Sequence, residues 1–396
     1  MSKIKKIGYT LNEIGIIQAP ISYQNHRGDV NPYICTCNKE MLPIFVAPME
    51  SVTDENNYKT WISNKICPVV PRSVMQRLSV NDRVKLAKET FVSFSLQEAI
   101  DMYEFNVFDL FLENDKNAIH ICIDIAHGTL SNLYDICKKI KDKYGDGVII
   151  MTGNINTPKA YKLYCQAGID YVRASIGSGS RCTTACAPGV YSPMATLLDD
   201  LYEEKKTIMK YNELAIKRNE PTLKLTKIIA DGGISWYSDI QKSLVLGADA
   251  VMIGRLFAEC EESCGEWHWA FSEEDAESNN WLSTDERDRW ISDWNYQVSH
   301  GGASLGFGDN PFNLKPFRMY RGMSHRSSQK ITGGTGNKVS EGICKHVSIK
   351  YPVKHFLMNV EAYLRSCMTY INASNIDEMK NAEVIIINDG GLAIKK

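Results

Sequence analysis

Eight short apolar runs rich in β-branched residues recur between residues 43 and 253, with helix-like segments between them. Strands that are buried on both faces have such continuous apolar sequences, because helices cover both sides of a parallel sheet. Eight strands that alternate with helices predict a (β/α)8 TIM barrel, with a flavodoxin-like open sheet as the alternative. The predicted strands are residues 43–47, 67–70, 91–95, 119–124, 148–151, 171–174, 227–231 and 250–253.

Polar and glycine-rich segments directly follow most of these predicted strands. The C-terminal ends of the strands of a parallel barrel open onto one face, and active sites of this fold lie there. We therefore expect one site at that face. Its predicted parts are Met49 and Glu50, Arg72, residues 124–128, Gly153 and Asn154, residues 175–184, residues 231–233, and Gly254 and Arg255.

The segment after the sixth predicted strand reads Ile-Gly-Ser-Gly-Ser-Arg-Cys-Thr-Thr over residues 176–184. Its glycines permit turns that leave backbone amides around Ser180 free to bind phosphate oxygens, and Gly233 and Gly254 would add further amides. A thiolate at Cys182 would be a nucleophile, whereas a cysteine that only packs is the alternative. The whole pattern indicates covalent chemistry on a phosphorylated substrate.

The composition narrows the class of partner. Lysine and arginine number 45 against 47 acidic residues, so no excess of positive charge favours nucleic acid or an anionic membrane. No segment reaches the roughly 18 apolar residues of a membrane span, and no apolar run follows the N-terminal lysines. Twelve cysteines without a short, dense framework indicate reduced thiols rather than disulfides. We expect a cytoplasmic protein with a small-molecule partner.

We expect a single catalytic domain over residues 1–396, with two additions to a minimal barrel. Residues 267–317 contain five of the seven tryptophans and predict an ordered insertion. It would be either a small helical appendage with its own aromatic core, or an oligomer contact or lid over the mouth. Residues 324–341 follow the eighth strand, are glycine-rich and have almost no apolar side chains, which predicts a mobile active-site flap.

Taken together, these motifs resemble the IMP dehydrogenase/GMP reductase family. The resemblance runs in family order and covers most of the chain outside the tryptophan-rich insertion. The matching segments are residues 47–53, 124–128, 153–154, 176–184, 231–234, 247–254, 261–266, 320–323 and 340–342.

The resemblance implies that Cys182 attacks C2 of a purine nucleoside monophosphate and forms a thioimidate, which exchanges a hydride with a nicotinamide cofactor. Asp231 would hold the ribose hydroxyls. The implied catalytic residues are Cys182, Thr184, Glu341 and Arg72; the implied substrate ligands are Met49, Ser180, Asp231, Gly233, Gly254, Arg255, Tyr320 and Met323; Asp124 and Asn154 would line the nicotinamide side.

The flap sequence bears on the direction of the reaction. Family dehydrogenases activate water with an Arg-Tyr pair in the flap, and residues 327–342 contain neither residue type. The resemblance therefore favours reduction of GMP by NADPH to IMP and ammonia, with Glu341 and Thr184 relaying the proton. IMP dehydrogenase using NAD, with Arg326 as the base, is the runner-up. A catalytically silent nucleotide-binding regulator is the second alternative.

Three arginines depart from the family pattern: Arg72 follows a proline where reductases carry His-Lys, and Arg181 and Arg255 replace small or aliphatic residues. The last two would either clamp phosphate or point outward to acidic neighbours. The resemblance also implies a homo-tetramer. A K+ ion would be bound by the carbonyl oxygens of Gly177, Gly179 and Cys182.

Overall fold

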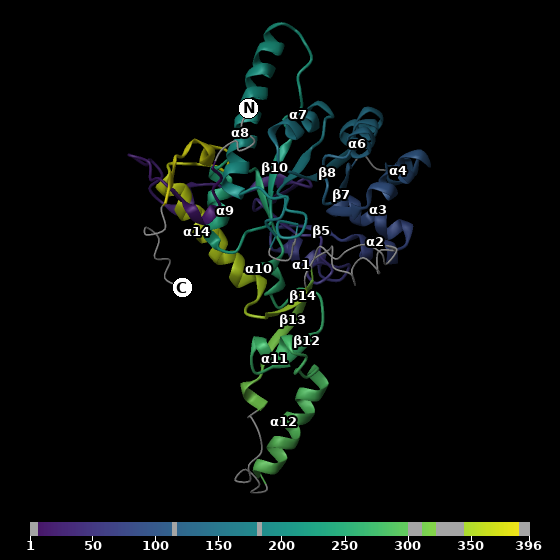
Figure 1. Cartoon of the computed structure of the whole chain (residues 1–396), viewed down its shortest axis with the longest axis vertical. Helices are drawn as coiled ribbons and strands as arrows, with labels where there is room; N and C mark the ends of the chain where they lie inside the picture. The colour runs from purple at the N-terminus through teal and green to yellow at the C-terminus, as the bar shows by residue number, and fades with distance from the viewer. Residues whose placement is uncertain (1–6, 113–116, 180–183, 300–310, 322–343, 388–396) are drawn as a thin grey trace.

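The computed structural model describes residues 7–112, 117–179, 184–299, 311–321 and 344–387 (Figure 1). Eight parallel strands form a closed barrel in chain order, and the last strand pairs with the first. All eight predicted strands are confirmed, and the open-sheet alternative is wrong. The strands are β4 (Ile44–Val46), β5 (Cys67–Val70), β6 (Phe91–Phe94), β7 (Ile119–Asp124), β8 (Val148–Ile155), β9 (Tyr171–Ala174), β10 (Lys227–Asp231) and β11 (Ala250–Ile253).

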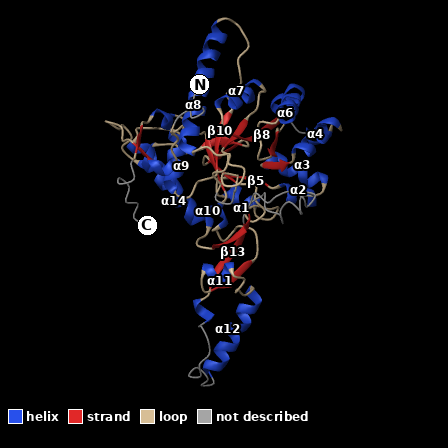
Figure 2. Ribbon diagram, in the orientation of Figure 1, coloured by secondary structure: helices blue, strands red, loops and turns tan. Residues whose placement is uncertain are grey.

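Helices surround the barrel and cover its strands (Figure 2). Local sequence fixes several of their starts: Ser95 and Glu98 form a reciprocal capping box before α4, and Pro158 occupies the first turn of α7. The helices are α1 (Tyr58–Ser63), α2 (Arg72–Arg77), α3 (Val80–Glu89), α4 (Leu96–Glu104), α5 (Val107–Leu112), α6 (Ser131–Tyr144), α7 (Pro158–Gln166), α8 (Met194–Lys217), α9 (Tyr237–Val245), α10 (Arg255–Ala258) and α14 (Val353–Tyr370). None of the helices in the described ranges is both long and apolar enough to cross a membrane.

Three aromatic rings pack against one another between non-adjacent strands of the barrel. Phe45 of β4, Phe91 of β6 and Tyr171 of β9 meet edge to face, with ring centroids 5.4–5.8 Å apart. Their side chains are buried. Such contacts across the lumen show that the barrel is a packed core rather than a channel, and they support the mouth above it.

Two buried aspartates lie immediately before β9 and β11, at the end of the barrel opposite the mouth. Asp170 accepts the Ile150 backbone amide at 2.8 Å, and Asp249 accepts the Ile228 amide at 2.7 Å. Asp249 also binds the ammonium groups of Lys205 and Lys380 at 2.7 and 2.6 Å. Each carboxylate thus joins a neighbouring barrel strand to surrounding cations.

The chain after α10 leaves the barrel and forms an antiparallel three-stranded sheet of β12 (Trp267–Ala270), β13 (Lys315–Arg321) and β14 (Cys344–Ser348). Helices α11 (Glu273–Glu277) and α12 (Thr284–Ser299) follow β12 and project with the sheet away from the barrel (Figure 1). The tryptophan-rich segment therefore contains strands as well as helices. Its small core consists of Ala270, Ala276 and Phe317, against which Trp281 packs. The flap predicted at 324–341 lies outside the described residues.

Short strands complete the fold. β1 (Ile14–Ile16) pairs with β15 (Val384–Ile386), and β2 (Ile34–Thr36) forms a hairpin with β3 (Lys39–Met41). The β1–β15 pair brings the two ends of the described chain together beside α9 and α14 (Figure 1).

We predict that Asp249→Asn destabilises the protein by about 3–5 kcal/mol, because it leaves Lys205 and Lys380 buried beside a neutral amide. Burial favours the neutral form of Asp249, but the two lysine charges outweigh it and hold the pKa of Asp249 below its ordinary value. Stability from such a carboxylate is present above its unfolded pKa and lost as the pH falls through its folded pKa. Urea unfolding should therefore show the full deficit at pH 7 and a smaller one below about pH 4.

Asp377→Asn is the matched control, because Asp377 binds the same Lys380 at 2.9 Å from a side chain that is 88% exposed. It should cost less than about 1 kcal/mol. Equal losses in the two variants would contradict the role assigned to Asp249.

Candidate functional site

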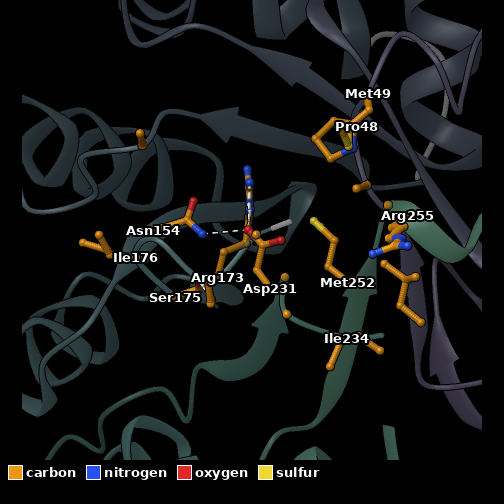
Figure 3. Close-up of a pocket in the computed structure, with 18 of the residues that line it drawn as sticks. Pro48, Met49, Asn154, Arg173, Ser175, Ile176, Asp231, Ile234, Met252 and Arg255 are labelled. Carbon is orange, nitrogen blue, oxygen red and sulfur yellow. Dashed lines mark hydrogen bonds and ion pairs between the residues drawn. The ribbon is translucent and has the colours of Figure 1, made fainter. Parts of the chain in front are cut away.

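A cavity of about 470 Å³ opens at the C-terminal ends of the barrel strands (Figure 3). Its size lies within the usual range for small-molecule sites. Residues from the ends of β4, β7, β8, β9, β10 and β11 line it, together with Arg72 after β5 and Tyr320 from β13. The site thus forms at the face that the sequence predicts.

Every described residue with a role implied by the family resemblance lines the cavity, whereas Glu50, His127, Gly128 and Gly153, also predicted at this face, do not line it. Around the cavity lie Met49, Arg72, Asp124, Asn154, Gly177, Gly179, Thr184, Asp231, Gly233, Gly254, Arg255 and Tyr320. The predicted nucleophile Cys182, together with Ser180, Met323 and Glu341, lies outside the described residues, as does Arg181.

At the centre of the site, the guanidinium of Arg173 joins the carboxylates of Asp124 and Asp231. It donates to Asp124 Oδ1 at 2.5 Å through Nη1, and to Asp231 Oδ2 at 2.9 Å through Nε. The Asn154 side chain donates to the same Asp231 oxygen at 2.7 Å (Figure 3). β7, β8, β9 and β10 thus each contribute one member of a connected polar network.

Burial and charge act against each other in this network. Burial disfavours the ionised form of Asp124, but the positive charges of Arg173 and Arg72 outweigh that effect and hold the pKa of Asp124 below its ordinary value. Burial also disfavours the Arg173 cation, whereas Asp231 and Asp124 raise the pKa of Arg173 well above its ordinary value. Asp124 and Arg173 therefore both stay charged at neutral pH.

The two oxygens of Asp231 have different surroundings. Oδ2 accepts the hydrogen bonds of Arg173 and Asn154. Oδ1 has no hydrogen-bond partner among the described residues, and the carboxylate is oriented toward the cavity (Figure 3). Asp231 can therefore accept a hydrogen bond from a ligand without breaking a contact that holds it in place.

Glycines allow the chain to approach the cavity closely at two points. A Cβ on Gly254 would stand 2.6 Å from Tyr320 Oη and 2.8 Å from Met49 Sδ, so a larger residue would require one of these side chains to shift. Tyr320 Oη itself lies 3.2 Å from Met49 Sδ. Gly233 has φ of 75°, a conformation that favours glycine, and borders the cavity together with Gly254. The two glycines thus leave space in the region where the sequence predicts that backbone amides bind a phosphate.

Arg173 is the one central residue that sequence reasoning did not assign to the site. The sequence places it only within the predicted strand 171–174. The available signal was its charge: an arginine within a strand whose other residues are buried needs carboxylate partners. The sequence does not show that those partners are Asp124 and Asp231.

The described residues contain no group of three or more His, Cys, Asp or Glu side chains arranged to hold a metal ion. Gly177 and Gly179, predicted to offer carbonyl oxygens to K+, lie at the cavity, whereas Cys182, the third predicted ligand, is not described.

Comparison with known proteins agrees with this arrangement. A family model described as the IMP dehydrogenase / GMP reductase domain matches residues 99–277. Proteins named inosine-5'-monophosphate dehydrogenase are 32% identical over 273 residues in Chlorobaculum parvum, 31% over 278 in Cryptosporidium parvum and 39% over 274 in Staphylococcus haemolyticus. Each match covers 69% of this chain and, in the same order, 46%, 56% and 46% of the relative. The chain thus spans about half the length of the relatives it matches.

The parallel barrel, the position of the motifs around its mouth and these matches agree with one another. The chain belongs to the IMP dehydrogenase/GMP reductase family.

Proposed function

We propose that the cavity binds a purine nucleoside monophosphate and that the protein is an NAD(P)-dependent oxidoreductase acting at C2 of the purine. The observation that carries the proposal is Oδ1 of Asp231, which has no hydrogen-bond partner in the described part of the chain and which the Arg173–Asn154 contacts orient toward the cavity. A carboxylate held in this way suits the hydroxyl groups of a ribose, since each hydroxyl can donate a hydrogen bond.

The charge of the cavity supports an anionic ligand. Arg72, Arg173 and Arg255 line its described part against the carboxylates of Asp124 and Asp231, although the whole chain carries a net charge of -2. The glycine-bordered region between Gly233 and Gly254 would receive the 5'-phosphate, where backbone amides can donate to its oxygens.

Asp124 and Asn154 would hold the nicotinamide end of the cofactor. Their chemistry fits an amide-bearing ring: Asn154 uses its NH2 group on Asp231, which leaves its side-chain oxygen to accept from a carboxamide. A nicotinamide held by these two residues would supply or accept the hydride. The protein's own residues fix Asp124 and Asn154 through Arg173 and Asp231, so the cofactor and ribose sides are oriented together.

For the direction of the reaction, we propose reduction of GMP by NADPH to IMP and ammonia through a Cys182 thioimidate. The support is the composition of residues 327–342, which lack the Arg-Tyr pair that would activate water. Without efficient hydrolysis, the thioimidate would survive to exchange a hydride. Glu341 and Thr184 would pass a proton to the departing amine.

Oxidation of IMP to XMP with NAD is the second candidate. It is favoured by the names of the relatives, which are inosine-5'-monophosphate dehydrogenases. Nothing in the Asp124–Arg173–Asp231 arrangement distinguishes the two directions, because both would use the same nucleotide and cofactor positions.

An absorbance assay at 340 nm separates the candidates. We expect consumption of NADPH with GMP. Formation of NADH or NADPH from the oxidised cofactor with IMP would instead support the dehydrogenase. Nucleotide binding without either reaction would contradict both and indicate a silent regulator.

We predict that Cys182→Ala leaves nucleotide affinity within about threefold of the wild type and abolishes turnover, because only the covalent step needs the sulfur. Calorimetric titration with GMP and the absorbance assay would measure the two effects. Cys186→Ala, in the same loop and exposed, is the control. Turnover that persists at the wild-type rate in Cys182→Ala would refute the covalent mechanism.

We predict that Asp231→Ala weakens binding of GMP by about tenfold or more, because a charge-assisted hydrogen bond is lost. The loss should largely disappear for 2',3'-dideoxy-GMP, which has no hydroxyl for the carboxylate to bind. Equilibrium binding of both nucleotides to both proteins forms a double-mutant cycle. The same loss with both nucleotides would mean that Asp231 only supports the fold.

A further inference from the structure

Arg255 stands at the edge of the cavity and is only loosely held. It is the first residue of α10, follows Gly254 directly and lines the cavity (Figure 3). Its side chain is 47% exposed, and its Nε lies 3.5 Å from Oε1 of Glu259, one turn later in the chain. At 3.5 Å, and with the guanidinium half in solvent, this contact contributes little stability. The guanidinium can therefore change partner at low cost.

Glu259 has a second and closer cation. Its side chain is only 6% exposed, and its Oε2 accepts from Lys350 Nζ at 2.9 Å, with Tyr351 Oη at 3.4 Å. Lys350 does not line the cavity. If Arg255 turned away, the buried Glu259 carboxylate would still be neutralised by Lys350, so no buried charge would be left unpaired.

We propose that Arg255 is a specificity residue that leaves Glu259 to bind the 5'-phosphate of the substrate, while Lys350 stays on Glu259. The inference rests on the proposed nucleotide site. The planar guanidinium can donate two hydrogen bonds to one phosphate, which adds a charged clamp to the neutral amides beside Gly233 and Gly254. Arg255 thereby selects nucleotides over nucleosides.

The two cations that share Glu259 are coupled by this arrangement. When Lys350 is present, Glu259 attracts Arg255 less strongly and the arginine is free for phosphate. When Lys350 is removed, Arg255 becomes the nearest cation to a buried carboxylate and is held there. A residue outside the cavity thus controls the affinity for phosphate, but only through Arg255.

Calorimetric titration with GMP and with guanosine tests the proposal in Arg255→Ser, Lys350→Gln and the double variant. Arg255→Ser should weaken GMP binding by about tenfold or more and change guanosine binding by less than about twofold. Lys350→Gln should weaken GMP binding by about threefold in the presence of Arg255 and have no effect in the Arg255→Ser background.

Lys354→Gln is the matched control, because Lys354 is an exposed lysine of α14 near Lys350 in sequence and has no contact with Glu259 among the described residues. It should leave both affinities unchanged. Equal losses for GMP and guanosine in Arg255→Ser, or a Lys350→Gln effect that persists without Arg255, would overturn the inference while the nucleotide site stands. Failure of the wild type to bind GMP or IMP would overturn the proposed function and the inference together.

Discussion

The buried guanidinium of Arg173 lies between the carboxylates of Asp124 and Asp231, and the rest of the site is arranged around that contact. Withdrawing these three groups from water costs several kcal/mol per ion, and their mutual attraction repays this only when the geometry is good. Removing any one of them would leave an unbalanced buried charge. The arrangement is therefore weak as a source of stability but strong as a constraint on geometry, because β7, β9 and β10 must end at matching heights for the charges to meet.

The two ends of the barrel use aspartate differently. Opposite the mouth, Asp170 and Asp249 bind backbone amides of adjacent strands and the ammonium groups of buried lysines, which fixes how neighbouring strands lie against each other. At the mouth, aspartates bind a central cation and leave acceptor capacity for a ligand. The packed rings of Phe45, Phe91 and Tyr171 lie between these levels. The aspartate contacts opposite the mouth and the aromatic core thus hold the carboxylates at the mouth in position before a ligand binds.

The sequence predicts the barrel well because each strand is a local apolar run, and it predicts most of the site because polar residues follow those runs. It does not predict pairings that depend on distance in three dimensions. The role of Arg173 depends on partners from two other strands, and β12 pairs with β13 across the entire tryptophan-rich segment. The tryptophans indicated an ordered segment, but a short strand such as Trp267–Ala270 has no distinctive pattern without its partner.

The residues that line the described part of the cavity do not distinguish the two reaction directions. Reduction of GMP and oxidation of IMP would use the same nucleotide position, the same cofactor position and the same attack at C2. What differs is the fate of the covalent intermediate, which depends on whether water is activated beside it. In this chain the relevant segment, residues 327–342, has neither arginine nor tyrosine, whereas Arg72 and Arg255, two of the three arginines that depart from the family pattern, line the cavity. Arg72 keeps the positive charge that reductases carry as lysine, whereas Arg255 adds a positive charge to the lining of the cavity. Under the proposed function, Arg255 would strengthen the binding of an anionic ligand, and a segment without the Arg-Tyr pair would leave the intermediate to hydride delivery rather than to hydrolysis.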